Sequence, residues 1–204
     1  GSFVDHNNIA YTGTYGTVLL GNLFNMTYLL EGSPYAIDPE KMANTYEMIL
    51  RSFQPVIYRG LMMDMVNGRA ISREQTQNIG YGVEAIEHMI QYANIAPPAY
   101  QGQLQSMVKE WLVNGYDLLN RFQSVPAISI AKTMLDDDAI PLRGELIRHY
   151  NFANMDRVVH RRPDYAFTIS MYSDRIGPYE GNMNGENLKG HYTGSGMTYL
   201  YNDD

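Results

Sequence analysis

The chain has 204 residues, a hydrophobic content of 45% and a formal net charge of −7 at pH 7. It contains no cysteine, which excludes disulfides and thiolate metal sites, and it has no run of about 18 apolar residues that could span a membrane. The negative charge repels polyanions at long range, so no nucleic-acid partner is expected and any other polyanion must bind at local positive groups.

The first half of the chain is predicted to be helical. Apolar residues wrap more than half of the circumference of a helix over residues 15–30, so this helix is expected to be largely buried and to end near Gly32. Residues 38–40, Asp-Pro-Glu, have the order of an N-cap, a first-turn proline and a first-turn acid, and they predict a second helix that ends before Pro55. Residues 56–65 are apolar with a glycine inside, and they predict a short helix or an extended segment.

Three further helices are predicted. Ser72 and Gln75 have the spacing of a capping box, which predicts that a helix starts at Ser72 and continues until a pair of prolines breaks the chain. The next helix covers residues 104–122, with Gly115 as a weak point. Residues 128–135 are predicted to form one more short helix, which three aspartates at residues 136–138 end.

The apolar period then changes to two. Residues 165–171 alternate and predict a strand, residues 197–201 predict a second strand, and the Gly- and Asn-rich residues 177–190 predict a loop between them. Helical hairpins followed by strands indicate an α+β chain in two parts, which we divide as residues 1–145 and residues 146–204.

Positive side chains gather in two places. The first is formed by Arg69 and Arg73. The second is the run Arg157–Arg162, which includes His160. We interpret this run as a solvated strand at a sheet edge, where charge prevents aggregation, rather than as a substrate contact.

The N-terminal stretch, residues 1–16, is polar and rich in glycine, and it leads directly into the first predicted helix. A loop of this kind can hold reactive groups in fixed positions. Its residues with reactive side chains are His6, Tyr11 and Tyr15. The alternative is a helix-entry loop in which the histidine caps a backbone group and the tyrosines only pack.

Three motifs in a fixed order give the chain a family resemblance. The first combines residues 1–6, Gly-Ser-Phe-Val-Asp-His, with residues 11–16, Tyr-Thr-Gly-Thr-Tyr-Gly. The second is the arginine motif of residues 63–73, and the third combines Asn-Gly-Glu-Asn at residues 184–187 with Gly-His-Tyr-Thr at residues 190–193. Together they resemble family 8 of the polysaccharide lyases, which contains the hyaluronan, chondroitin and xanthan lyases.

The resemblance implies the second half of an α/α toroid, made of helical hairpins, followed by the first strands of an antiparallel β super-sandwich. It implies an internal fragment of a longer protein, monomeric and either secreted or periplasmic, whose substrate is an acidic polysaccharide of the hyaluronan or chondroitin type. The fragment alone is expected to be inactive, because the family's carboxylate-neutralising asparagine and aromatic patch lie upstream of these motifs. The implied reaction is β-elimination at a uronic acid, which needs no metal and no organic cofactor.

The resemblance also assigns catalytic roles. Tyr15 matches the tyrosine that takes the C5 proton and then protonates the leaving oxygen. A free tyrosine has a pKa of about 10 and is a poor base near neutrality, but a guanidinium nearby favours its ionised form, and Arg69 matches the arginine in that place. His6 matches a histidine that contacts the substrate carboxylate region or assists the proton transfer. Arg73 is assigned to substrate anchoring, with a surface charge at a helix start as the alternative.

The Gly- and Asn-rich loop is expected to support the site. Asn187 is assigned to substrate binding and Glu186 to support of the arginine or the sugar. Glu180 and Asn184 compete with Glu186 for that supporting role.

Other functions stay open. A glycoside hydrolase on an α/α barrel needs two carboxylates across a cleft, for which Asp5, Asp64 and Glu84 are available without an obvious pair. A non-catalytic carbohydrate-binding module would keep the fold without the chemistry, and the intact motif residues argue against it. Xanthan is the alternative polymer within the same family.

Overall fold

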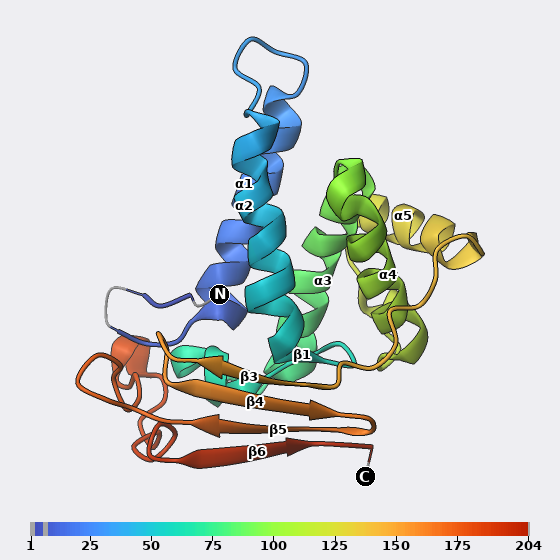
Figure 1. Cartoon of the computed structure of the whole chain (residues 1–204). Helices are drawn as coiled ribbons and strands as arrows, with labels where there is room; N and C mark the ends of the chain where they lie inside the picture. The colour runs from blue at the N-terminus through green and yellow to red at the C-terminus, as the bar shows by residue number, and fades with distance from the viewer. Residues whose placement is uncertain (1–2, 6–7, 204) are drawn as a thin grey trace.

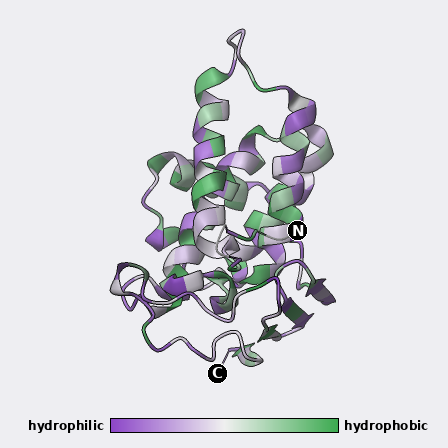
Figure 2. Ribbon diagram, turned by 90° about the vertical axis from the view of Figure 1, so that its left-hand side faces the viewer, coloured by the Kyte–Doolittle hydropathy of each residue, from purple (hydrophilic) through white to green (hydrophobic). Residues whose placement is uncertain are grey.

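The computed structural model describes residues 3–5 and 8–203 of the chain. A group of helices lies above a four-stranded antiparallel sheet in Figure 1. Figure 2 shows the same arrangement from the side, with apolar segments of the helices in green. The helices come first in the chain and the sheet last, which confirms the predicted α+β class. No helix within the described ranges is both long and apolar enough to cross a membrane.

The chain enters its first helix through a wide turn. Thr12–Gly16 form a π-helical turn, in which the backbone N–H of Gly16 donates to the carbonyl of Tyr11. Helix α1, Thr17–Leu30, follows directly. A π-helical turn has a wider backbone than an α-helical turn and is frequent at functional sites, so this entry changes the direction of the side chains it carries.

The prediction that the first helix is largely buried is wrong. Leu20 and Phe24 are buried, and α1 packs against helix α3, Gln77–Ile95. The opposite face carries exposed apolar side chains, namely Val18, Leu19, Met26 and Leu29. The pattern correctly indicated an apolar helix, but the described residues cover only one side of it.

Helix α2 begins where its capping residues predict. The carboxylate of Asp38 accepts a hydrogen bond from the backbone N–H of Glu40 at 2.9 Å. Helix α2 covers Pro39–Met48 and continues through a π-helical turn, Ile49–Phe53, into the 3₁₀ turn Gln54–Val56. The helical path therefore includes Pro55 and ends at Val56, two residues beyond the predicted end before Pro55.

The next residues form a small hairpin, which is the extended one of the two predicted alternatives. Strand β1, Ile57–Tyr58, pairs antiparallel with strand β2, Leu61–Met62. Arg59 and Gly60 make the turn with φ values of 47° and 92°. A two-residue hairpin turn with both central residues at positive φ matches the twist of its strands, and glycine is favoured at the second position.

The predicted helix start at Ser72 is wrong, because α3 begins five residues later, at Gln77. Ser72 ends the 3₁₀ turn Gly68–Ser72, and its hydroxyl donates to the carbonyl of Arg69 at 3.0 Å. The same hydroxyl accepts from the backbone N–H of Asn187 at 3.1 Å. This serine therefore joins two segments that are distant in sequence, where the motif indicated a local helix cap.

Two helices complete the helical part. Helix α4 covers Pro98–Asn114, and Gly115, predicted as a weak point within a longer helix, in fact ends it. A single 3₁₀ turn, Leu119–Arg121, follows. Helix α5 covers Val125–Asp136, which includes the predicted residues 128–135, and it lies against α3 and α4.

The sheet has the strand order β3-β4-β5-β6, with every neighbouring pair antiparallel. Strand β6, Met197–Tyr201, coincides with the second predicted strand, and strand β5, Tyr165–Ser170, ends one residue before the predicted end of the first. Strand β3, Arg148–Phe152, was not predicted, and strand β4, Arg157–Arg162, was expected only as a solvated strand at a sheet edge. The buried positions of β4 include Arg157 and Arg161, so no alternation of apolar and polar residues marks this strand.

The interpretation of the run 157–162 as a solvated sheet edge is wrong. Strand β4 lies inside the sheet, and Arg157 and Arg161 are 5% and 1% exposed. Arg161 donates to the carbonyls of Pro55 and Ile57, and Arg157 donates to the carbonyl of Met65 at 2.9 Å. Burial lowers the pKa of both arginines to about 10, so both stay charged at neutral pH and fasten the sheet to the helical part.

Candidate active site

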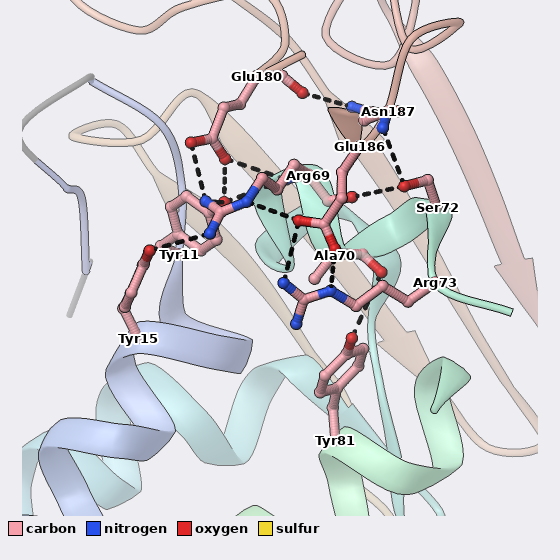
Figure 3. A network of polar contacts seen from close by, with 10 residues as sticks. All are labelled: Tyr11, Tyr15, Arg69, Ala70, Ser72, Arg73, Tyr81, Glu180, Glu186 and Asn187. Atoms are coloured by element: carbon pink, nitrogen blue, oxygen red, sulfur yellow. Dashed lines mark hydrogen bonds and ion pairs between the residues drawn. The ribbon is translucent and has the colours of Figure 1, made fainter. Parts of the chain in front are cut away.

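The site lies where three segments meet: the entry to α1, the arginine loop (residues 63–73) and the C-terminal loop (residues 177–190) (Figure 3). The N-terminal stretch and the C-terminal loop lie side by side in Figure 1, and the backbone N–H of Gly177 donates to the carbonyl of Asn8 at 2.8 Å. The first and last quarters of the sequence are therefore brought together on one side of the molecule.

Arg69 occupies the centre of the site, with a side chain that is only 10% exposed. Its Nε donates to Glu186 at 2.8 Å. Its Nη1 donates to Glu180 at 3.1 Å and to the Tyr11 hydroxyl at 2.9 Å. Its Nη2 donates to the Tyr15 hydroxyl at 3.2 Å. Each guanidinium nitrogen thus has a partner, which fixes the plane of the group.

The sheet holds the arginine loop from below. The hydroxyl of Tyr201 on β6 donates to the Asp64 carboxylate at 2.7 Å and accepts from the Asp64 backbone N–H at 2.9 Å. Asn78 donates to the same carboxylate at 2.8 Å, and Arg157 on β4 holds the carbonyl of Met65. The arginine loop is therefore anchored at its beginning, through Asp64 and Met65.

Tyr15 is the exposed tyrosine of the site. Its side chain leaves the π-helical turn and it is 44% exposed. Its ring contacts the edge of the Tyr11 ring at a centroid distance of 4.7 Å, and the Arg69 guanidinium carbon lies 5.8 Å from its ring centroid. Tyr15 therefore combines access from solvent with a hydrogen bond from a cation.

Glu186 bridges the two arginines of the motif. It accepts from Nε of Arg73 at 2.6 Å and from Nη2 of Arg73 at 3.1 Å, in addition to its bond from Arg69. The two hydrogen bonds from Arg73, and then the one from Arg69, hold the pKa of the Glu186 carboxyl below its ordinary value. Arg73 lies in the site with a side chain that is 41% exposed, and its substrate-anchoring role stays a prediction.

The C-terminal loop bends sharply to bring two glutamates to Arg69. Left-handed φ values occur in it at Asn182, Asn184, Gly185 and Asn187. Asn187 is 8% exposed, and its side-chain amide donates to the carbonyl of Glu180 at 2.6 Å. Asn187 therefore holds the loop in shape, and its assignment to substrate binding stays a prediction. Asn184 is exposed at the outer bend of the loop, whereas Glu180 and Glu186 both contact Arg69.

Tyr11 belongs to the reactive side chains of the N-terminal stretch, and the family resemblance assigns it no role. It is 1% exposed, its hydroxyl donates to the Glu180 carboxylate, and it accepts from the backbone N–H of Arg69 at 3.2 Å. Burial, followed by the hydrogen bond to Glu180, raises the pKa of Tyr11 well above its ordinary value. Its spacing of four residues from Tyr15 was the one signal in the sequence that the two rings meet.

His6 lies outside the described residues, so its catalytic assignment stays a prediction. Among residues 3–5 and 8–203, no group of three or more His, Asp and Glu side chains could hold a metal ion.

Two family profiles match the sequence. The one described as "Polysaccharide lyase family 8, N terminal alpha-helical domain" matches residues 1–110, and the one described as "Polysaccharide lyase family 8, super-sandwich domain" matches residues 147–204. The chain belongs to polysaccharide lyase family 8, which confirms the resemblance read from its three motifs. The division of the chain after residue 145 stays a prediction.

The chain is similar along its whole length to characterised family members. It is 37% identical to a xanthan lyase of Bacillus sp. (strain GL1) over 207 residues, which cover 100% of this chain and 22% of that protein. It is 39% identical to a hyaluronate lyase of Thermasporomyces composti over 208 residues, covering 100% and 26%. The chain thus spans about a quarter of the length of these relatives.

Solved structures agree with the sequence comparison. A Paenibacillus xanthan lyase superposes with a TM-score of 0.93 at 40% identity, over 98% of this chain and 19% of that one. The Streptomyces coelicolor A3 chondroitin AC lyase, in complex with chondroitin sulphate, superposes with a TM-score of 0.90 at 33% identity, over 100% and 29%.

Proposed function

We propose that this chain carries the proton-transfer part of a polysaccharide lyase, which cleaves an acidic polysaccharide by β-elimination at a uronic acid. The observation that carries the proposal is the hydrogen bond from Nη2 of Arg69 to the hydroxyl oxygen of Tyr15, at 3.2 Å. A donor from a fixed cation stabilises negative charge on the phenol oxygen, and a phenolate at an exposed position can reach a substrate proton.

In the proposed step, the phenolate oxygen of Tyr15 takes the proton from C5 of the uronic acid. The electron pair of the C5–H bond forms the C4–C5 double bond, and the C4–O bond to the next sugar breaks. Tyr15, now neutral, returns its proton to the leaving oxygen. One residue can perform both transfers because they are consecutive and occur on neighbouring atoms, so no net proton is consumed.

The carboxylates of the site support a lyase over a hydrolase. A glycoside hydrolase uses two carboxyl groups that face the scissile bond. Glu180 and Glu186 both accept hydrogen bonds from Arg69, and the Asp64 carboxylate is held by Tyr201 and Asn78. These carboxylates are engaged in holding the loop and its arginine, which leaves the phenol of Tyr15 as the group open to substrate.

Relatives that act on hyaluronan, xanthan and chondroitin sulphate by their printed names support a uronic-acid polymer as the substrate. We propose the hyaluronan or chondroitin type, with xanthan as the alternative, and a site of action outside the cytoplasm, where such polymers occur. We also propose that turnover requires segments beyond these 204 residues, because the relatives are about four times as long.

The test replaces Tyr15 by phenylalanine in the longest natural protein that contains this chain. Initial rates of unsaturated product, read by ultraviolet absorbance, are measured on hyaluronan, chondroitin and xanthan. Loss of a general acid–base group lowers turnover by about 10²- to 10⁴-fold, so Tyr15→Phe should fall in that range.

Tyr28→Phe is the matched control, because Tyr28 is an exposed tyrosine on α1, 64% exposed and outside the site. It should keep the parent rate. A Tyr15→Phe variant that retained more than about a tenth of the parent rate, a change of only about 1.4 kcal/mol in barrier, would remove Tyr15 from the proton-transfer role and make His6 the leading candidate.

A further inference from the structure

Two tyrosines reach the same arginine, but their surroundings differ. Tyr15 is 44% exposed and its hydroxyl is contacted by Nη2 of Arg69. Tyr11 is 1% exposed and its hydroxyl lies between Nη1 of Arg69 and the Glu180 carboxylate. The pair therefore consists of one phenol open to substrate and one phenol enclosed by protein.

The direction of the hydrogen bonds at Tyr11 is fixed by chemistry. A guanidinium can only donate and a carboxylate can only accept, so the Tyr11 hydroxyl must accept from Arg69 and donate its proton to Glu180. This arrangement closes a ring of contacts, since Nη1 of Arg69 also donates to Glu180 at 3.1 Å. These three contacts fix the position of Nη1 of Arg69. They therefore also fix the place where Nη2 of the same group meets the Tyr15 hydroxyl.

The Tyr11 ring lies where a side chain at position 68 would otherwise be, which only glycine leaves open. Gly68 has a φ of +55°, and a Cβ atom at this position would lie 2.0 Å from Cζ of Tyr11. The backbone N–H of Arg69, the next residue, donates to the Tyr11 hydroxyl at 3.2 Å and to Glu180 at the same distance. A side chain at position 68 is thus excluded by the Tyr11 ring, and the hydroxyl of that ring accepts a hydrogen bond from the loop backbone.

We infer that Tyr11 is a positioning residue, which holds the Arg69 guanidinium against Glu180 so that Nη2 of Arg69 donates to Tyr15. The inference rests on the proposed function, because it concerns the arginine that stabilises the Tyr15 phenolate. The charged and titratable groups around the Tyr11 hydroxyl among the described residues are Arg69, Glu180, Glu186, Tyr15 and, through Glu186, Arg73. Tyr11 itself does not touch the reacting atoms.

The first test measures kcat, KM and the pH profile of Tyr11→Phe in the longest natural protein that contains this chain. We expect kcat to fall about 10- to 100-fold with KM within about twofold, because a bond to a charged group is lost while the substrate surface is unchanged. The ascending limb of the pH profile should move to higher pH, because a loosened Arg69 stabilises the Tyr15 phenolate less.

Tyr92→Phe is the matched control, since Tyr92 is fully buried and donates to the Leu20 carbonyl within the helical core at 3.1 Å. It should lose stability without moving the pH profile. Gly68→Ala keeps the Tyr11 hydroxyl but displaces the ring, and it should reproduce the shifted profile. A Tyr11→Phe variant with the rate and pH profile of Tyr92→Phe would overturn the inference.

A second measurement does not depend on activity. The thermal midpoints of Tyr11→Phe, Glu180→Gln and the double variant are compared, and the two losses should fail to add, because both remove members of one network. Additive losses would overturn the inference even where the variants are active. If the unchanged protein forms no unsaturated product, the proposed function fails, while non-additive midpoints still support the network around Tyr11.

Discussion

Replacement of Glu186 by glutamine tests how the C-terminal loop is attached to the arginine loop. Glu186 accepts one hydrogen bond from Arg69 and two from Arg73, and these bonds join segments 113 and 117 residues apart in sequence. Glutamine has nearly the same shape but no charge, and its amide group can offer only one oxygen to two guanidinium groups. The substitution therefore removes charge pairing while leaving the packing of the loop almost unchanged.

The magnitude follows from the exposure of each partner. The Arg69 side chain is 10% exposed, so its bond to a charged acceptor is worth about 1.5–3 kcal/mol. The Arg73 side chain is 41% exposed, and an ion pair as open to solvent as this one adds about 0–1 kcal/mol to stability. We expect a loss of about 2 kcal/mol in the free energy of unfolding, which lowers the thermal midpoint of a domain of this size by about 4–8 °C.

The assay is thermal unfolding of the unchanged protein and of Glu186→Gln, at pH 7 and again below pH 4. The pKa of Glu186 is lowered in the folded state, so its stabilising effect is present above its unfolded value of about 4.3 and is lost as the pH falls through its folded value. Glutamine does not titrate. The difference in midpoint between the two proteins should therefore be full at pH 7 and shrink on acidification.

Glu47→Gln is the control, because it makes the same substitution in an exposed ion pair. The Glu47 side chain is 38% exposed and that of its partner Arg51 is 73% exposed. Its cost should stay below about 1 kcal/mol. Equal midpoints for Glu186→Gln and Glu47→Gln at pH 7, or a Glu186 effect that did not change with pH, would refute the reasoning about the bridge.

The remaining predictions concern the arginine and its support from the sheet. Arg69→Lys keeps a positive charge but loses the planar fork that contacts two carboxylates and two phenols, so we expect reduced activity with a pH optimum shifted to the alkaline side, measured by initial rates of unsaturated product. An unchanged optimum would contradict this. Tyr201→Phe removes the hydroxyl that holds Asp64 and should lower the free energy of unfolding by about 1.5–3 kcal/mol in denaturant titrations. Because burial raises the pKa of Tyr201 well above its ordinary value, this loss should be constant across neutral pH; a loss that varied there would count against it.

Local signals in the sequence predicted the elements that depend on local chemistry. The cap at Asp38 and the alternating strand Tyr165–Ser170 appear in the structure as predicted. The strand Arg157–Arg162 was misread, because its buried positions are filled by arginines whose partners are backbone carbonyls elsewhere in the chain. A buried polar contact of this kind has no period, so hydrophobic patterning cannot detect it.

The site shows the same division. The motifs indicated Tyr15, Arg69 and the glutamates of the C-terminal loop, and the structure brings these residues together. Tyr11 was a candidate reactive residue without an assigned role, and Ser72 was expected only to cap a helix. Their contacts cross 58, 115 and 169 residues of chain, so only folding decides them.

The sequence by itself determined the class of this protein and the residue types of its site, because family motifs, caps and apolar periods are properties of neighbouring residues. The tertiary structure decided which of two tyrosines faces solvent and which is enclosed. The physical reason is the π-helical turn at Thr12–Gly16 and the left-handed backbone at Gly68, which place the Tyr11 ring against the arginine loop and direct Tyr15 outward. Two identical side chains four residues apart thereby acquire different surroundings, and only Tyr15 is open to solvent.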